Sequence, residues 1–103
     1  MAYFMTTPLG REVPAGDWQA YGQDQILRLL YEFALVPFND GTLLYSVASI
    51  CNATNLDLAP AIQLARDLVV QGFAEEVAQG KFRITQRGVQ LVHTLANGFE
   101  SPL

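Results

Sequence analysis

The chain has little charge, a single cysteine and no long apolar run, and each of these shortages excludes a class of protein. Only 16% of its 103 residues are charged, whereas globular domains average about 25%. The lone Cys51 cannot build an internal disulfide framework, which favours a reducing cytoplasm. No stretch reaches the roughly 18 apolar residues that cross a bilayer, and the start of the chain lacks the pattern of a secretory signal. We therefore expect a cytoplasmic protein with no membrane partner.

The residues that are present indicate one folded domain with an acidic surface. Half of the chain (50%) is hydrophobic and the net charge is -4, so disorder is excluded. Acidic residues outnumber basic ones by 10 to 6, and this balance argues against strong nonspecific attraction to nucleic acid. Because charge is sparse and apolar surface plentiful, we expect part of that surface to be buried against a partner or a second copy.

Residues 1–16 contain closely spaced prolines and glycines, which leave no helical or strand period. We predict an extended N-terminal arm there. The arm is rich in apolar side chains such as Tyr3 and Phe4, so we expect it to pack on its own domain or on a neighbour.

Three segments with apolar residues at three- and four-residue spacing predict helices. The first is capped by Asp17 and stops before Pro37; a turn at 39–41 follows, then a helix over 43–54. The third is capped by Asp57 and ends before Gly72. The predicted buried faces comprise Ile26, Leu27, Leu30, Phe33 and Ala34, then Leu44, Val47, Ala48 and Cys51, then Ile62, Ala65, Leu68 and Val69.

The remainder of the chain predicts a hairpin and one more helix. Two short strands, 73–78 and 81–85, flank a Gly-containing turn. Thr85 then caps a helix that Gly98 closes. Its predicted apolar face contains Val89, Val92, Leu95 and Ala96.

The order of three helices, hairpin and helix resembles the winged helix-turn-helix superfamily, in the manner of MarR-like and ArsR-like regulators. The residues that carry the resemblance are Leu68, Gly72, Phe73, Ile84, Thr85, Arg87 and Gly88, within the segment 64–92. The resemblance implies an α+β, mostly α fold with a three-helix core, a two-stranded wing and a C-terminal helix. The corresponding domain limits are 1–16 for the arm, 17–99 for the winged-helix domain and 100–103 for a tail.

The resemblance further implies that the third helix enters the major groove of double-stranded DNA while the wing contacts the backbone. Gln63 and Arg66 are then the candidate base readers, and Lys81 and Arg83 the candidate backbone contacts. The expected function is that of a dimeric transcriptional regulator. An alternative stays open, because Asp67 repels phosphate and Val70 is apolar: a winged-helix module that binds a protein partner and not DNA.

A homodimer is expected because winged-helix regulators commonly dimerise through elements outside the three-helix core. The candidate interface residues are Tyr3, Phe4, Trp18, Tyr21, Val92 and Leu95. Stacking on bases would need basic residues beside the aromatic side chains, and Arg11 is the one basic residue of the arm, which favours packing.

Catalysis, metal binding and cofactors are not expected. His93 and Cys51 are the only residues of their types, and neither has the partners that a metal site or a nucleophile requires. Adjacent residues of a strand point to opposite faces, so Glu75 and Glu76 should not converge and should form a solvated edge. No phosphate-binding loop or hydrolase motif is present.

Overall fold

The computed structural model describes residues 3–35 and 44–100, the last five of these by their backbone alone. Its elements are β1 (Phe4–Thr6), β2 (Glu12–Pro14), α1 (Trp18–Ala34), β3 (Tyr45–Ser46), α2 (Val47–Thr54), α3 (Leu58–Val70), β4 (Ala74–Ala78), β5 (Lys81–Ile84) and α4 (Gln86–Glu100). These described residues form two antiparallel sheets, β1–β2 and β3–β5–β4. The predicted α+β class is confirmed. Pro37, the predicted turn at 39–41 and residues 101–103 lie outside the described part of the chain.

The N-terminal segment is a β-hairpin, so the prediction of an extended arm was wrong. Met5 pairs with Val13 across β1 and β2, and the Thr7 amide donates to the Arg11 carbonyl at 2.8 Å to close the turn. Gly10, with φ +83°, lies within that turn. The residues that interrupt the sequence period therefore form the turn of the hairpin.

Helix α1 begins as predicted and holds the hairpin with a buried ion pair. The Asp17 carboxylate accepts the Ala20 amide at 3.1 Å, as an N-cap does. Asp24, only 2% exposed, accepts two hydrogen bonds from the Arg11 guanidinium, one of them from Nε to Oδ2 at 3.1 Å. The hairpin is thus fixed to the outer side of α1.

The second helix starts at Val47, later than predicted, because the residues before it form a strand. Tyr45 pairs with Phe82 of β5, which gives the sheet a third strand that the sequence analysis did not include. Ser46 then caps α2, its hydroxyl oxygen accepting the Ser49 amide at 3.2 Å. The first residues of the predicted helix are therefore used to extend the sheet.

Helix α3 ends at the predicted glycine by a well-defined hydrogen-bond pattern. The Phe73 amide donates to the Leu68 carbonyl at 2.9 Å and the Gly72 amide to the Val69 carbonyl at 3.0 Å, with Gly72 at φ +86°. At the other end Asp57 occupies the N-cap position, but its side chain makes no capping hydrogen bond.

The junction between α3 and α4 is tightly packed. Thr85 caps α4 by accepting the Gly88 amide at 3.1 Å, and its hydroxyl donates to the Gly72 carbonyl at 2.6 Å. A Cβ at Gly88 would lie 2.2 Å from the Phe73 carbonyl oxygen, so only glycine fits there. Gly98 lies inside α4 and does not close it, because the helix continues to Glu100.

The core lies where α1, α2 and α3 meet β5, with the central-strand residue Phe82 fully buried. Its buried members are Ile26, Leu27, Leu30, Ile50, Ala61, Leu64, Ala65, Leu68, Ala74, Phe82 and Val92. Ala34 and Ala48, both predicted to be buried, are exposed, and in α2 the fully buried residue is Ile50. Ala61 and Leu64 lie deeper than the predicted Ile62 and Val69, because the buried face of α3 is rotated relative to the predicted stripe.

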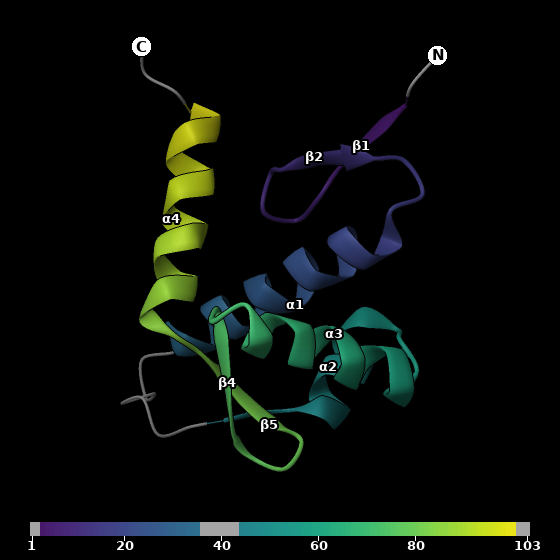
Figure 1. Ribbon diagram of the computed structural model, residues 1–103, viewed down its shortest axis with the longest axis vertical. Helices are drawn as coiled ribbons and strands as arrows, with labels where there is room; N and C mark the ends of the chain where they lie inside the picture. Colours follow the sequence, from purple (N-terminus) through teal and green to yellow (C-terminus); the bar gives the residue numbers. More distant parts are fainter. Residues whose placement is uncertain (1–2, 36–43, 101–103) are drawn as a thin grey trace.

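The two hairpins lie at opposite ends of the molecule. The β4–β5 hairpin projects at one end, and the β1–β2 hairpin and the C-terminal part of α4 both lie toward the other (Figure 1). None of the helices in the described ranges combines the length and the apolar character needed to cross a bilayer.

Candidate functional site

The candidate site is the outward face of α3 together with the β4–β5 hairpin. Since Ala61, Leu64, Ala65 and Leu68 point into the core, the opposite side of α3 is presented to solvent. That side includes the predicted residues Gln63 and Arg66 and the apolar Val70, which is 86% exposed.

Arg66 is held by a carboxylate of the β4–β5 hairpin along one edge of its guanidinium group. Its Nε and Nη2 donate to the two carboxylate oxygens of Glu76 at 3.0 and 3.1 Å. This hydrogen-bonded pairing raises the pKa of Arg66. The pKa of Glu76 is lowered by the same bonds and by the Gly80 amide, which donates to it at 2.9 Å. Glu76 therefore connects α3 to the turn of the hairpin.

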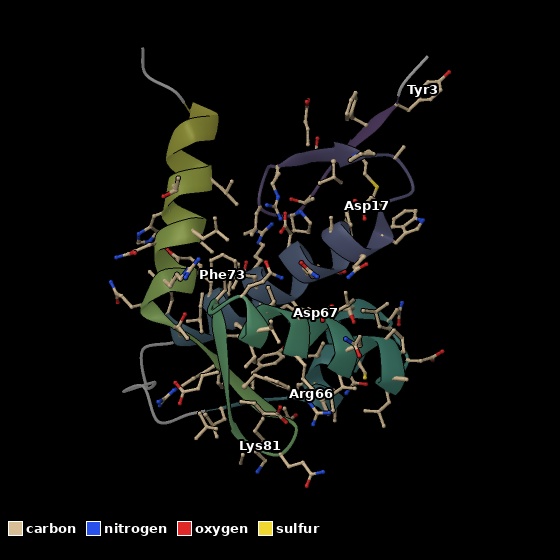
Figure 2. All side chains as sticks on the ribbon, in the orientation of Figure 1. Tyr3, Asp17, Arg66, Asp67, Phe73 and Lys81 are labelled. Carbon is tan, nitrogen blue, oxygen red and sulfur yellow. The ribbon has the colours of Figure 1, made fainter. Side chains whose placement is uncertain are left out.

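Asp67 is turned toward α1, away from Arg66 (Figure 2). Its carboxylate accepts hydrogen bonds from the amides of Gln63 at 3.0 Å, Gln19 at 3.4 Å and Gln23 at 3.5 Å. All three donors are neutral, and within the described residues Asp67 makes no ion pair. The side-chain amide of Gln63, one of the two candidate base readers, is thus directed at Asp67.

The hairpin offers less positive charge than its sequence indicates. The Arg83 guanidinium pairs with Glu75 at 3.2 Å, whereas Lys81 is exposed near the turn and makes no side-chain hydrogen bond or ion pair in the described part of the chain. Arg87 lies over the Phe73 ring, 5.3 Å from its centre. Glu75 and Glu76 do not converge, as expected. The Glu75 side chain is 51% exposed, as expected of a solvated edge, whereas that of Glu76 is 20% exposed, and each carboxylate also pairs with an arginine.

A groove runs between the N-terminal end of α1 and the first turns of α3. Its volume is about 430 Å³. Most of its lining is apolar, from Trp18, Leu56, Pro60 and Leu64, and Asp67 supplies a charged oxygen. Trp18 is 68% exposed and packs edge-on against Tyr21, with ring centres 5.8 Å apart.

The residues predicted for a dimer interface do not share one environment. Tyr3, Phe4 and Trp18 are exposed, whereas Tyr21 is half-buried. The two predicted residues of α4 differ as well: Val92 is buried in the core of its own chain and Leu95 keeps part of its surface. The exposed members lie on the β1–β2 hairpin and the start of α1.

The remaining candidate residues are used in structural contacts. The Tyr31 hydroxyl and His93 Nε2 are hydrogen-bonded at 2.9 Å, which joins α1 to α4. Cys51 is half-buried against the core. Throughout the described residues, no group of three or more His, Cys, Asp or Glu side chains is placed to hold a metal ion.

The sequence analysis missed the Asp67 cluster and the groove beside it. The available signal was the pair Gln19 and Gln23, which lie one helical turn apart on α1 and so share a polar stripe. Their partner on α3 could not be identified without the packing of the two helices. A comparison of the chain with protein-family models, curated proteins and solved structures found no match.

Proposed function

We propose that the chain is a winged-helix domain that binds a protein partner through the outward face of α3. The order α1, α2, α3, β4, β5, α4 supports this proposal, with β4–β5 as the wing, although strand β3 between α1 and α2 was not part of the expected arrangement. In this proposal the helix that reads DNA in related regulators serves as a protein-binding surface.

The observation that carries the proposal is the pairing of Arg66 with Glu76. Arg66 is the only basic residue in α3, and one edge of its guanidinium, formed by Nε and Nη2, is already hydrogen-bonded to a carboxylate. With Asp67 one position further on, the local balance of charge is negative. Protein–DNA interfaces are strongly positive, whereas the centres of protein–protein interfaces are depleted of charge.

Exposed apolar side chains at the two ends of α3 favour a protein partner. Val70 is 86% exposed and Leu58 is 60% exposed, one near each end of α3. Burying such side chains against a partner is favourable at about 25 cal/mol per Å² of apolar surface. A DNA backbone offers no apolar surface along the length of α3 that could bury both side chains.

The second candidate function is DNA binding, which Lys81 favours. Its ammonium group lies at the exposed end of the hairpin, where a wing contacts the phosphate backbone. One phosphate contact supports only weak binding, because each neutralised phosphate contributes separately to the salt-dependent affinity.

A titration of labelled random duplex DNA at several salt concentrations decides between the two functions. We expect no saturable binding of the wild-type chain at 50 mM salt up to about 100 μM protein, the weak end of ordinary nonspecific binding. The matched control is the double variant Asp67→Asn/Glu76→Gln, which keeps Arg66 and removes both negative charges. We expect that variant to gain weak binding that falls with salt. Wild-type binding below about 10 μM that weakens steeply with salt would refute the proposal.

The partner-binding face is tested with a photo-crosslinking amino acid at Val70 in cells that express the chain. We expect a discrete crosslinked protein, lost when Leu58→Asp is added. The control is Leu35→Asp, which charges an equally exposed apolar position at the end of α1. An identical crosslinking pattern for the two aspartate variants would contradict a role of the α3 face.

A further inference from the structure

The groove between α1 and α3 combines an apolar lining, an exposed indole ring and a carboxylate that pairs with no cation among the described residues. Asp67 is the charged residue of the lining, and the apolar members include Trp18, Leu56 and Pro60. The arginine next to Asp67 in the sequence faces the other way, toward Glu76. The negative charge in the groove is therefore not neutralised by any described residue of this chain.

Further negative charge flanks the groove. Asp17 precedes Trp18, and Asp57 follows Leu56. Neither carboxylate takes part in an ion pair within the described residues. Because Asp67 is the one charged residue of the lining, and its charge is negative, the groove favours a cation over a neutral or anionic group.

We infer that the groove binds an arginine side chain of the protein partner, with its guanidinium against Asp67 and Trp18 and its aliphatic stem along Leu56 and Pro60. The inference rests on the proposed function and names the chemistry of the partner. An arginine fits each part of the groove. Its planar group bonds a carboxylate and stacks on an indole ring, and its methylenes cover apolar surface.

The three glutamine amides around Asp67 support this assignment. Since they donate at 3.0, 3.4 and 3.5 Å, two of the three bonds are long and weak. A charge-assisted bond from a guanidinium is stronger than a neutral one, so the incoming cation replaces the weaker amides at little cost.

The test uses Trp18 as its own reporter, because it is the only tryptophan in the chain and lines the groove. The probe is the peptide acetyl-Gly-Leu-Arg-Leu-Gly-amide, titrated into the full chain at low salt. The control peptide carries citrulline in place of arginine, which has nearly the same shape without the charge. We expect a saturable change of Trp18 emission, with the arginine peptide bound about three- to tenfold more tightly than the citrulline peptide.

The matching protein variant is Asp67→Asn, which removes the charge and retains an oxygen for the glutamine amides. We expect it to bind both peptides equally and as weakly as the wild type binds the citrulline peptide. Glu12→Gln, an exposed carboxylate on the β1–β2 hairpin, is the matched control and should retain the preference for arginine. The comparison of the two peptides on the wild type stands even if a variant fails to fold.

Equal affinity of the wild type for the two peptides overturns the inference. Sedimentation gives a second outcome that would overturn the inference. If the wild type self-associates, the arginine peptide dissociates the assembly and Asp67→Asn does not self-associate, the occupant of the groove is a second copy of the chain. If the wild type shows no preference for the arginine peptide and does not bind DNA, the groove inference is refuted and the proposed function is not. Salt-dependent DNA binding by the wild type refutes the function on which the groove inference rests.

Discussion

The buried ion pair between Arg11 and Asp24 predicts an unequal cost for removing its two members. The Asp24 side chain is 3% exposed, whereas the Arg11 side chain is 40% exposed. When Arg11→Ala removes the cation, a carboxylate is left buried without a partner. When Asp24→Asn removes the anion, the guanidinium can still turn to water. The alanine variant at Arg11 should therefore be the less stable of the two.

The loss of stability expected for each substitution follows from the exposure of the group that remains. Removing one partner of a fully buried pair costs about 3–5 kcal/mol, and we expect Arg11→Ala to fall at about 3 kcal/mol because the site is open on one side. For Asp24→Asn we expect about 1.5 kcal/mol, the loss of charge-assisted hydrogen bonds discounted for the solvent that reaches Arg11. The double variant Arg11→Met/Asp24→Leu should recover most of the stability, since it leaves no charge buried.

Urea denaturation followed by circular dichroism at pH 7 measures all three free energies of unfolding. The slope of the free energy with urea should stay constant, because the surface exposed on unfolding is nearly the same in each variant. Equal losses for Arg11→Ala and Asp24→Asn, or losses below about 0.5 kcal/mol, would refute the reasoning, because they are the behaviour of an exposed pair.

Two further predictions concern the hairpin and its junction with α4. Gly88→Ala should cost about 3 kcal/mol or more in thermal unfolding, because its Cβ would lie 2.2 Å from the Phe73 carbonyl oxygen; Gly16→Ala, at φ +94° with open space around it, should cost only about 1 kcal/mol, and equal costs would contradict the close approach. The pKa of Glu76 is lower in the folded chain than in the unfolded chain. The ionised carboxylate therefore stabilises the fold at pH values above its unfolded pKa, and this stabilisation is lost as the pH falls through its folded pKa. The Gly80 amide proton, followed by NMR, should therefore titrate with a midpoint below 4.5, the ordinary pKa of the glutamate, and a midpoint at or above it would be incompatible with the bond to Glu76.

Several features that depend on local sequence could be predicted, although the β1–β2 hairpin, which is also local, was missed. The Asp17 cap, the end of α3 at Gly72 and the Thr85 cap each depend on residues within a few positions, and all three are present. The β4–β5 hairpin was likewise indicated by its turn and its apolar residues. Such signals survive because the hydrogen bonds involved close within one turn of chain.

Features that depend on distant partners could not be predicted. Strand β3 exists because Tyr45 meets Phe82, and no pattern near residue 45 specifies that pairing. The same holds for the candidate site, where the sequence shows Arg66 as a cation and only the packing shows Glu76 beside it. Asp24 looked like one more polar residue of an amphipathic helix until the hairpin placed Arg11 over it.

The position of β5 in its sheet has a consequence for how the chain folds. As the central strand, β5 pairs with β4 through a short turn. Its pairing with β3 instead joins segments that are separated in the sequence by α2, α3 and β4. Closing a long loop costs more chain entropy than closing a short one. The β4–β5 hairpin should therefore form early as a template on which β3 docks late. Amide protons of β3 should then gain protection from hydrogen exchange after those of β4 and β5.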